Sequence, residues 1–191
     1  MRETDNKLDI ARYFLEQMEK YEKDGRDFQH NLNAFIVFVR SALHLLLEKE
    51  LTQISRQYKK TKEIEKHQKL TNWIQQKKSI YKDPLVDFFI KKRNYILKEA
   101  SPELIREINI TEPIHLTETI TVMRYDEHGQ LIDTTSSEPS TVKLPGKQLN
   151  NQSKWIFADW QGNEHIITLC KWFLSKLEHM LKEAKEFLSR L

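Results

Sequence analysis

The segment 83–100 carries the side chains whose types and spacing could do chemistry: Arg93, Asn94 and Lys98. At about 100° per residue, Arg93 falls at the centre of a helical face that is otherwise apolar. The apolar members of that face are Val86, Ile90 and Leu97. Burying a guanidinium without a partner is costly. We therefore expect Arg93 to meet a carboxylate of a neighbouring helix, backbone carbonyls, or the phosphate of a ligand.

Basic residues are concentrated around this segment. The whole chain has a net charge of +3, but residues 56–98 hold 13 basic and 4 acidic side chains, a balance of +9. Such a block favours binding to phosphate backbones or to an acidic protein. The alternative is that these lysines simply solvate two helix faces. The candidate nucleic-acid-binding residues are Lys91, Lys92, Arg93, Asn94 and Lys98.

Other kinds of chemistry find little support in the sequence. With 4 glycines in 191 residues, no phosphate-binding glycine-rich loop or nucleophile elbow can be drawn. The 7 histidines show no metal-ligand spacing, so we expect neither a metal nor a cofactor. Cys170 lies on an apolar stripe and is expected in the core. Trp155, Trp160 and His165 could stack on bases, or could pin a hairpin to a helical bundle.

The elements that must position these residues are mainly helical. Only 4 Gly and 5 Pro interrupt the chain, and the apolar residues from Phe28 to Ile54 repeat at steps of three and four. Asp83-Pro84 is a helix start signal. We expect a short helix after Ser101-Pro102, and longer helices over 5–23, 28–54, 61–81, 84–100 and 164–190. The predicted fold is a mainly α, antiparallel bundle of five or six helices.

Residues 108–163 differ in composition from the rest of the chain. They hold three of the four glycines, and residues 114–125 alternate between apolar and polar types, which is typical of a strand. A turn at 127–130 and a return strand at 131–134 would complete a hairpin. Further short strands are expected at 142–144 and 155–157. We interpret 108–163 as a small β-rich insertion within one domain spanning 1–191.

The sequence also predicts the compartment. No run reaches the roughly 18 apolar residues of a membrane span. The polar start of the chain does not resemble a signal peptide. A single cysteine excludes an internal disulfide and fits a reducing environment. We therefore expect a cytoplasmic protein with no membrane association.

Several short motifs resemble the bacterial HEPN-like proteins over most of the chain. They are Asn31/Asn33, Phe35, Arg40-Ser41-Ala42, Trp73, Asp83-Pro84-Leu85, Phe88/Phe89, Arg93-Asn94, Trp155-Ile156-Phe157 and Leu169-Cys170. The resemblance implies a helical domain that dimerises, with an active cleft between two protomers. It also implies a metal-independent ribonuclease, whose signature is an Arg, usually followed by Asn or another polar residue, and a His a few residues later.

This sequence keeps Arg93 and Asn94 but has Lys98 where that His belongs, and there is no His between His67 and His115. Cleavage through the RNA 2′-OH needs a group that exchanges protons near neutral pH. A Lys with an ordinary pKa of about 10.4 is a poor general base. The motif therefore predicts lost catalysis.

Three functions are compatible with the sequence. The first is a non-catalytic HEPN-like binding module for RNA or a cognate protein, related to stress or defence and of the toxin–antitoxin kind. The second is an active metal-independent ribonuclease that uses Arg93 and Asn94, with Lys98 or a histidine of the insertion replacing the missing group. The third is a purely structural dimer in which Arg93 is an ion-pair anchor. In each case we expect a homodimer that brings the 86–98 helices of two chains together.

Overall fold

The computed structural model describes residues 1–108, 115–118, 121–125, 130–138, 140–143 and 153–191. It divides into two compact units. The first, the helical unit, comprises Met1–Glu107 and Ser153–Leu191, and the second is Ile108–Gln152. The prediction of a mainly α bundle with a small β insertion is confirmed.

Helices form most of the helical unit. They are α1 (Arg2–Lys20), α2 (Gly25–His44), α3 (Leu51–Lys60), α4 (Ile64–Lys77), α5 (Pro84–Lys98) and α6 (Ile166–Ser189). A π-helical turn, η1 (Leu45–Glu50), joins α2 to α3, so that Gly25–Lys60 is one continuous helix, as the long apolar stripe predicts. A 3-10 helix, η2 (Lys78–Lys82), leads from α4 into α5.

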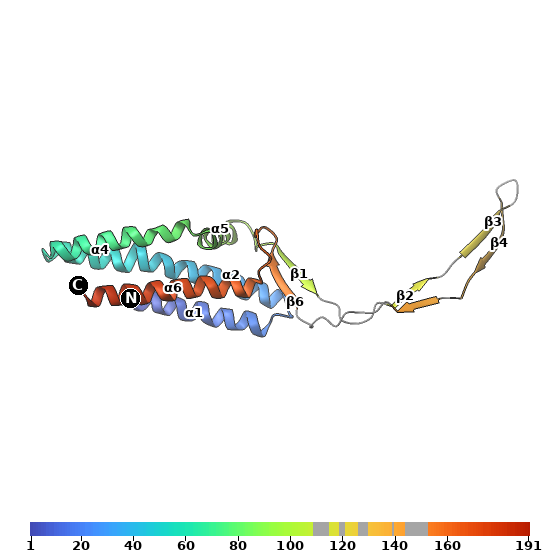
Figure 1. Cartoon of the computed structure of the whole chain (residues 1–191), viewed down its shortest axis with the longest axis horizontal. Helices are drawn as coiled ribbons and strands as arrows, with labels where there is room; N and C mark the ends of the chain where they lie inside the picture. The colour runs from blue at the N-terminus through green and yellow to red at the C-terminus, as the bar shows by residue number, and fades with distance from the viewer. Residues whose placement is uncertain (109–114, 119–120, 126–129, 139, 144–152) are drawn as a thin grey trace. The chain divides into compact units, whose positions relative to one another are not determined.

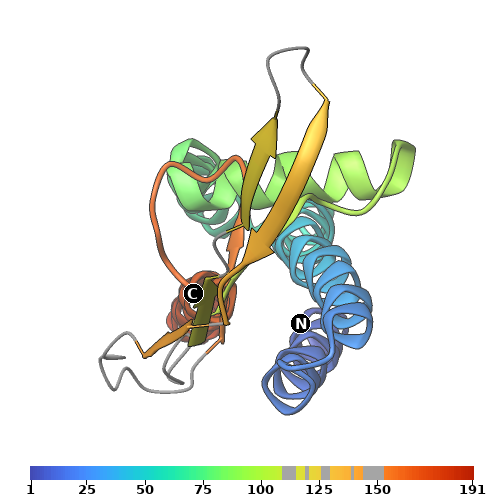
Figure 2. The same cartoon turned by 90° about the vertical axis from the view of Figure 1, so that its right-hand side faces the viewer.

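The long helices lie side by side, whereas α5 runs across them (Figures 1 and 2). Both chain termini lie at the end of the bundle where α3 turns into α4 (Figure 1). The core consists of the predicted stripes, which are fully or almost fully buried. Its members on α2 and α6 include Phe28, Leu32, Phe35, Val39, Ala42, Cys170, Phe173 and Leu177.

Two aspartates begin helices by capping them. Asp24 accepts hydrogen bonds from the backbone N–H groups of Arg26 and Asp27 at the start of α2. Asp83 accepts from Leu85 N and Val86 N at 3.0 and 3.2 Å, with Pro84 in the first turn of α5. The predicted start of α5 is therefore confirmed, and it depends on the local sequence alone.

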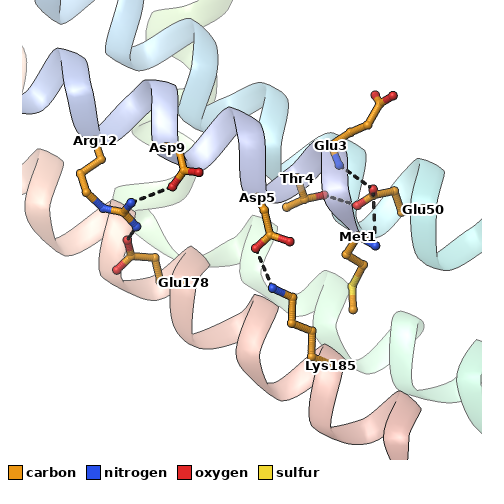
Figure 3. Close-up of polar contacts among 9 residues, drawn as sticks. All are labelled: Met1, Glu3, Thr4, Asp5, Asp9, Arg12, Glu50, Glu178 and Lys185. Atoms are coloured by element: carbon orange, nitrogen blue, oxygen red, sulfur yellow. Dashed lines mark hydrogen bonds and ion pairs between the residues drawn. The ribbon is translucent and has the colours of Figure 1, made fainter.

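Charged contacts hold α1 against its neighbours (Figure 3). Arg12 pairs with Glu178 of α6 at 2.6 Å, and Lys185 of α6 pairs with Asp5 at 2.6 Å. At the start of α1, Glu50 of η1 accepts hydrogen bonds from Glu3 N and from the buried Thr4 hydroxyl. These contacts fix the position of α1, which carries one residue of the site described below.

The segment after Ser101-Pro102 is a strand rather than the expected short helix. β1 (Leu104–Ile108) pairs with β6 (Ser153–Phe157), and Ala158 N donates to Glu103 O at 3.2 Å. A partner strand distant in sequence thus decides the conformation of this segment. β6, predicted from its β-branched and aromatic residues, is confirmed as a strand, and it belongs to the helical unit.

Three side chains in β6 and the segment after it stabilise the helical unit. Trp155 stacks on Phe28 with ring centroids 5.1 Å apart and donates to Glu22 O at 2.7 Å. Trp160 packs edge-on against Phe88 at 4.9 Å. His165 caps α6 by accepting from Ile167 N at 3.0 Å. The predicted uses of these residues are base stacking or pinning a hairpin to the bundle. The structure shows the two tryptophans packed against helix residues, and it gives His165 a capping role that the sequence does not predict.

The second unit contains two antiparallel strand pairs. β2 (His115–Glu118) pairs with β5 (Ser140–Lys143), and β3 (Thr121–Tyr125) pairs with β4 (Leu131–Ser136) in a register that places Arg124 opposite Asp133. The hairpin predicted around a turn at 127–130 is confirmed in its strands. The single strand predicted over 114–125 is two strands, and residues 114, 119–120, 126–129 and 144 lie outside the described part of the chain.

Among the described residues, one helix, Gly25–Lys60, is long and apolar enough to cross a membrane by length and composition. The same helix supplies fully buried core side chains, including Phe28, Phe35 and Leu43. The absence of a membrane association stays a prediction.

Candidate anion-binding site

A pocket of about 420 Å³ lies where α1, α2 and α5 meet. We call it the basic pocket. Its lining residues are Lys7 of α1, Arg40, Ser41 and His44 of α2, Leu45 of η1 and Arg93 of α5. None of these described lining residues is acidic.

Arg93 is half-buried in this pocket. Its Nη1 donates to Asn94 Oδ1 at 3.2 Å, while its Nε is buried and has no hydrogen-bond partner among the described residues. The expected ion pair with a carboxylate of another helix is not present in the described chain, so Arg93 is not an ion-pair anchor there. A buried, unsatisfied guanidinium nitrogen is costly, and an anion would satisfy it.

Two further cations reach the pocket from other elements, and both lie against aromatic rings. The Lys7 ammonium lies 5.0 Å from the centroid of Phe38, and the Arg40 guanidinium lies 6.0 Å from that of Tyr81. Neither pairs with a carboxylate in the part of the chain that the structure covers. Such contacts orient a cation and leave its hydrogen-bond donors available to a ligand.

His44 completes the lining. Burial lowers the pKa of His44, and the nearby cations Arg40, Lys49 and Arg93 lower it further, while Glu48 opposes them. Glu48 itself is paired with Lys78 at 3.0 Å. His44 is therefore neutral at pH 7, where one ring nitrogen donates a hydrogen bond and the other accepts a proton.

The apolar packing of α2 and α5 brings these side chains together. Phe35 of α2 and Phe89 of α5 are fully buried and meet with ring centroids 6.3 Å apart. Beyond this contact α5 leaves the core, because it crosses α2 instead of following it (Figure 2). Leu97, expected on the buried face, is 55% exposed for this reason. Arg93 lies at the boundary, where a half-buried cation meets solvent.

The other sequence-predicted site residues lie elsewhere. Lys92 is buried, paired with Asp159 at 2.6 Å and close to the rings of Phe88 and Phe157. Lys91 pairs with Asp87 one turn back at 2.7 Å. Lys98 is exposed at the last residue of α5 and does not line the basic pocket. Of the five predicted residues, only Arg93 lines the pocket, and Asn94 is its hydrogen-bond partner on the exposed surface of α5.

Reasoning from the sequence missed Lys7, Arg40 and His44 as members of one site. Arg40 and His44 are four residues apart, which places them on one face of the helix, at the edge of its apolar stripe. That spacing was the available signal. Lys7 had none, because it comes from a different helix.

Metal and thiol chemistry find no site in the described chain. Among the residues that the structure describes, no group of three His, Cys, Asp or Glu side chains could hold a metal ion. Cys170 is fully buried, and burial raises the pKa of its thiol well above the ordinary value. This environment suits a core residue rather than a nucleophile.

Comparison of the chain with protein-family models, curated proteins and solved structures gave no match.

Proposed function

We propose that this protein is a non-catalytic, HEPN-like binding module that holds a phosphate group of RNA in the basic pocket. The observation that carries the proposal is the convergence of Lys7, Arg40 and Arg93 from three helices with no carboxylate partner in the described chain. Cations that line one pocket repel one another, and an anion bound between them removes this repulsion. The pocket volume falls within the range typical of small-ligand sites.

A phosphate group fits this set of donors better than a carboxylate group does. Two guanidinium groups offer planar, forked donors that bind phosphate oxygens in pairs. Lys7 adds a third charge, and neutral His44 adds one ring N–H. An RNA strand supplies such phosphates at every nucleotide, and most protein–nucleic acid affinity comes from them.

The test is binding of a labelled single-stranded RNA 12-mer, measured by fluorescence anisotropy at several salt concentrations. Arg93→Gln and Arg40→Gln should each weaken binding about tenfold at low salt and reduce the log–log salt slope by about 0.7. Lys69→Gln is the matched control, because it removes one charge from the same basic block at an exposed residue paired with Glu65. Unchanged affinity in both pocket variants would overturn the proposal.

A second candidate function, a metal-independent ribonuclease, is favoured by one specific observation. His44 lines the pocket beside Arg93, although the sequence has no histidine between His67 and His115. A neutral imidazole could take the proton of a 2′-OH, while Arg93 and Arg40 stabilise the charge that develops on the phosphate. Lys98, the replacement suggested by the sequence motif, lies outside this pocket.

Incubation of single-stranded RNA with the protein and a chelator separates these two functions. We expect the RNA to remain intact, because the described lining of the pocket has one histidine and no second group that titrates near neutral pH to protonate the leaving oxygen. Cleavage that is lost in both His44→Gln and Arg93→Gln would instead establish the ribonuclease.

A further inference from the structure

A second basic surface follows the basic pocket along the same continuous helix. We call it the α3 groove: a shallow depression of about 580 Å³ whose lining runs from η1 through α3. The lining residues are Glu48, Lys49, Gln53, Arg56, Gln57 and Lys60. We propose that the α3 groove binds the RNA strand that leaves the basic pocket; this proposal rests on the function proposed above.

The charges of the groove are available to a ligand. Lys49, Arg56 and Lys60 are exposed, and none pairs with a carboxylate in the described ranges of the chain. Glu48, which alone is acidic among the described lining residues, is neutralised by Lys78 at 3.0 Å. The groove therefore presents net positive charge.

Ion pairing divides the basic block of residues 56–98 unevenly. Six of its 13 cations are paired with carboxylates: Lys66, Lys69, Lys77, Lys78, Lys91 and Lys92. The other seven have no such partner within the described residues: Arg56, Lys59, Lys60, Lys62, Lys82, Arg93 and Lys98. The unpaired charge gathers on α3 and at the basic pocket, while α4 is largely neutralised.

Helical spacing places the groove and the pocket on one side of the helix. Leu45, Lys49, Gln53, Arg56 and Lys60 follow one another at steps of four, four, three and four. Leu45 and Lys49 both belong to the π-helical turn, which holds more residues per turn than an α-helix. Four residues therefore make slightly less than one full turn there, so the two side chains lie on the same side of the helix. Lys49 is also close enough to lower the pKa of His44 in the pocket, which makes the two sites neighbours.

The length of this surface sets the size of its ligand. Arg40 and Lys60 are 20 residues apart, which is about 30 Å along a helix. A stacked strand advances about 3.4 Å per nucleotide, so roughly nine nucleotides are needed to reach from one end to the other. Gln53 and Gln57 add uncharged donors suited to phosphate and sugar oxygens, whereas none of the described lining residues is aromatic. We therefore expect binding that depends on length and not on base sequence.

An extended single strand fits this surface better than an acidic peptide. Its charge repeats at every nucleotide along the whole 30 Å, whereas a peptide must place several carboxylates on the same line. An oligoglutamate 12-mer tests this directly as a competitor for the labelled RNA. Competition as strong as that of an unlabelled RNA 12-mer would overturn the assignment to RNA.

The decisive experiment compares a dinucleotide, which reaches only the basic pocket, with a 12-mer, which spans pocket and groove. The double variant Arg56→Gln/Lys60→Gln should leave the Kd of the dinucleotide unchanged. It should weaken the binding of the 12-mer at least tenfold and reduce the log–log salt slope of that binding by about 1.4. The double variant Lys66→Gln/Lys69→Gln is the matched control, since it removes two charges of α4 that are paired with carboxylates.

The outcomes distinguish this inference from the proposed function. If the 12-mer binds the groove variant as tightly as the unchanged protein, while Arg93→Gln still weakens both ligands, the groove inference is wrong and the pocket stands. If Arg93→Gln weakens neither ligand, the proposed function itself fails. If the control variant weakens binding of the 12-mer as much as the groove variant does, the loss of affinity results from the net charge of the protein and not from the groove, and the inference is overturned.

Discussion

His44 is the residue of the basic pocket whose charge depends on pH. Burial and nearby cations lower the pKa of His44 in the folded protein. At a pH between that lowered pKa and 6.5, the unfolded chain therefore binds more protons than the folded one. The stability of the protein should therefore fall as the pH drops below 6.5. His44→Gln should reduce that loss, since glutamine takes up no proton.

The measurement is the thermal unfolding midpoint from pH 8 to pH 5 for both proteins. The variant should gain stability relative to the unchanged protein only below about pH 6.5. His30→Gln, at an exposed histidine of α2, is the control. A difference between His44→Gln and the unchanged protein that stays constant over this range would contradict the prediction.

Lys62 adopts an unusual backbone conformation at the end of α3. Its φ is 66°, in the left-handed region that favours glycine. The backbone hydrogen bonds Lys62 N to Lys59 O and Glu63 N to Tyr58 O form a Schellman motif, in which this position is usually glycine.

Lys62→Gly should stabilise the protein by about 1 kcal/mol, because the side chain's steric penalty disappears. For a chain of this size that corresponds to a rise of about 2–4 °C in the melting temperature, measured by calorimetry. Lys62→Ala is the control, since it removes the same charge but keeps Cβ. Equal melting temperatures for the two variants would show that the conformation stores no such strain.

At the scale of the element, α6 begins on an unusual cap. Because His165 Nδ1 accepts from Ile167 N at 3.0 Å, the ring proton lies on Nε2 and is donated to Glu22 Oε1 at 3.0 Å. His165 thus links the start of α6 to the end region of α1.

His165→Asn keeps an acceptor at the cap, whereas His165→Leu removes it. We expect the leucine variant to lose about 1 kcal/mol of unfolding free energy relative to the asparagine variant. Urea denaturation followed by circular dichroism measures this difference. Equal stability of the two variants would mean that the cap hydrogen bond contributes nothing.

At the scale of the whole molecule, apolar side chains remain exposed where α5 leaves the core. Tyr95, Leu97 and Ile105 are 39%, 55% and 46% exposed. Burying them against a second copy would remove apolar surface from water and place two basic pockets near each other. We predict a homodimer that forms through this end of α5.

Light scattering at micromolar concentration should give about twice the chain mass of 22.9 kDa. Leu97→Asp should produce a monomer that remains folded, since Leu97 contributes little to the core. Ile64→Asp, at an equally exposed apolar residue of α4, should leave the dimer intact. A monomeric unchanged protein would rule out this interface.

The sequence by itself determined most of the secondary structure of this protein. The long helix through Phe28 and Leu43, the start of α5 at Asp83-Pro84 and the β3–β4 hairpin all follow from local rules: periodicity, capping and turn chemistry. These rules act over a few residues, so a single sequence contains them. Arg93 stood out for the same reason, as a cation on an apolar helix face.

Only the tertiary structure decided which side chains meet. Residues 104–108 are a strand because β6 lies beside them, and Lys92 points to Asp159 rather than to a ligand. The basic pocket joins Lys7, Arg40 and Arg93, which no local pattern connects. The crossing of α5 over α2 sets this arrangement, and a crossing angle results from the packing of distant apolar faces, which local periodicity does not encode.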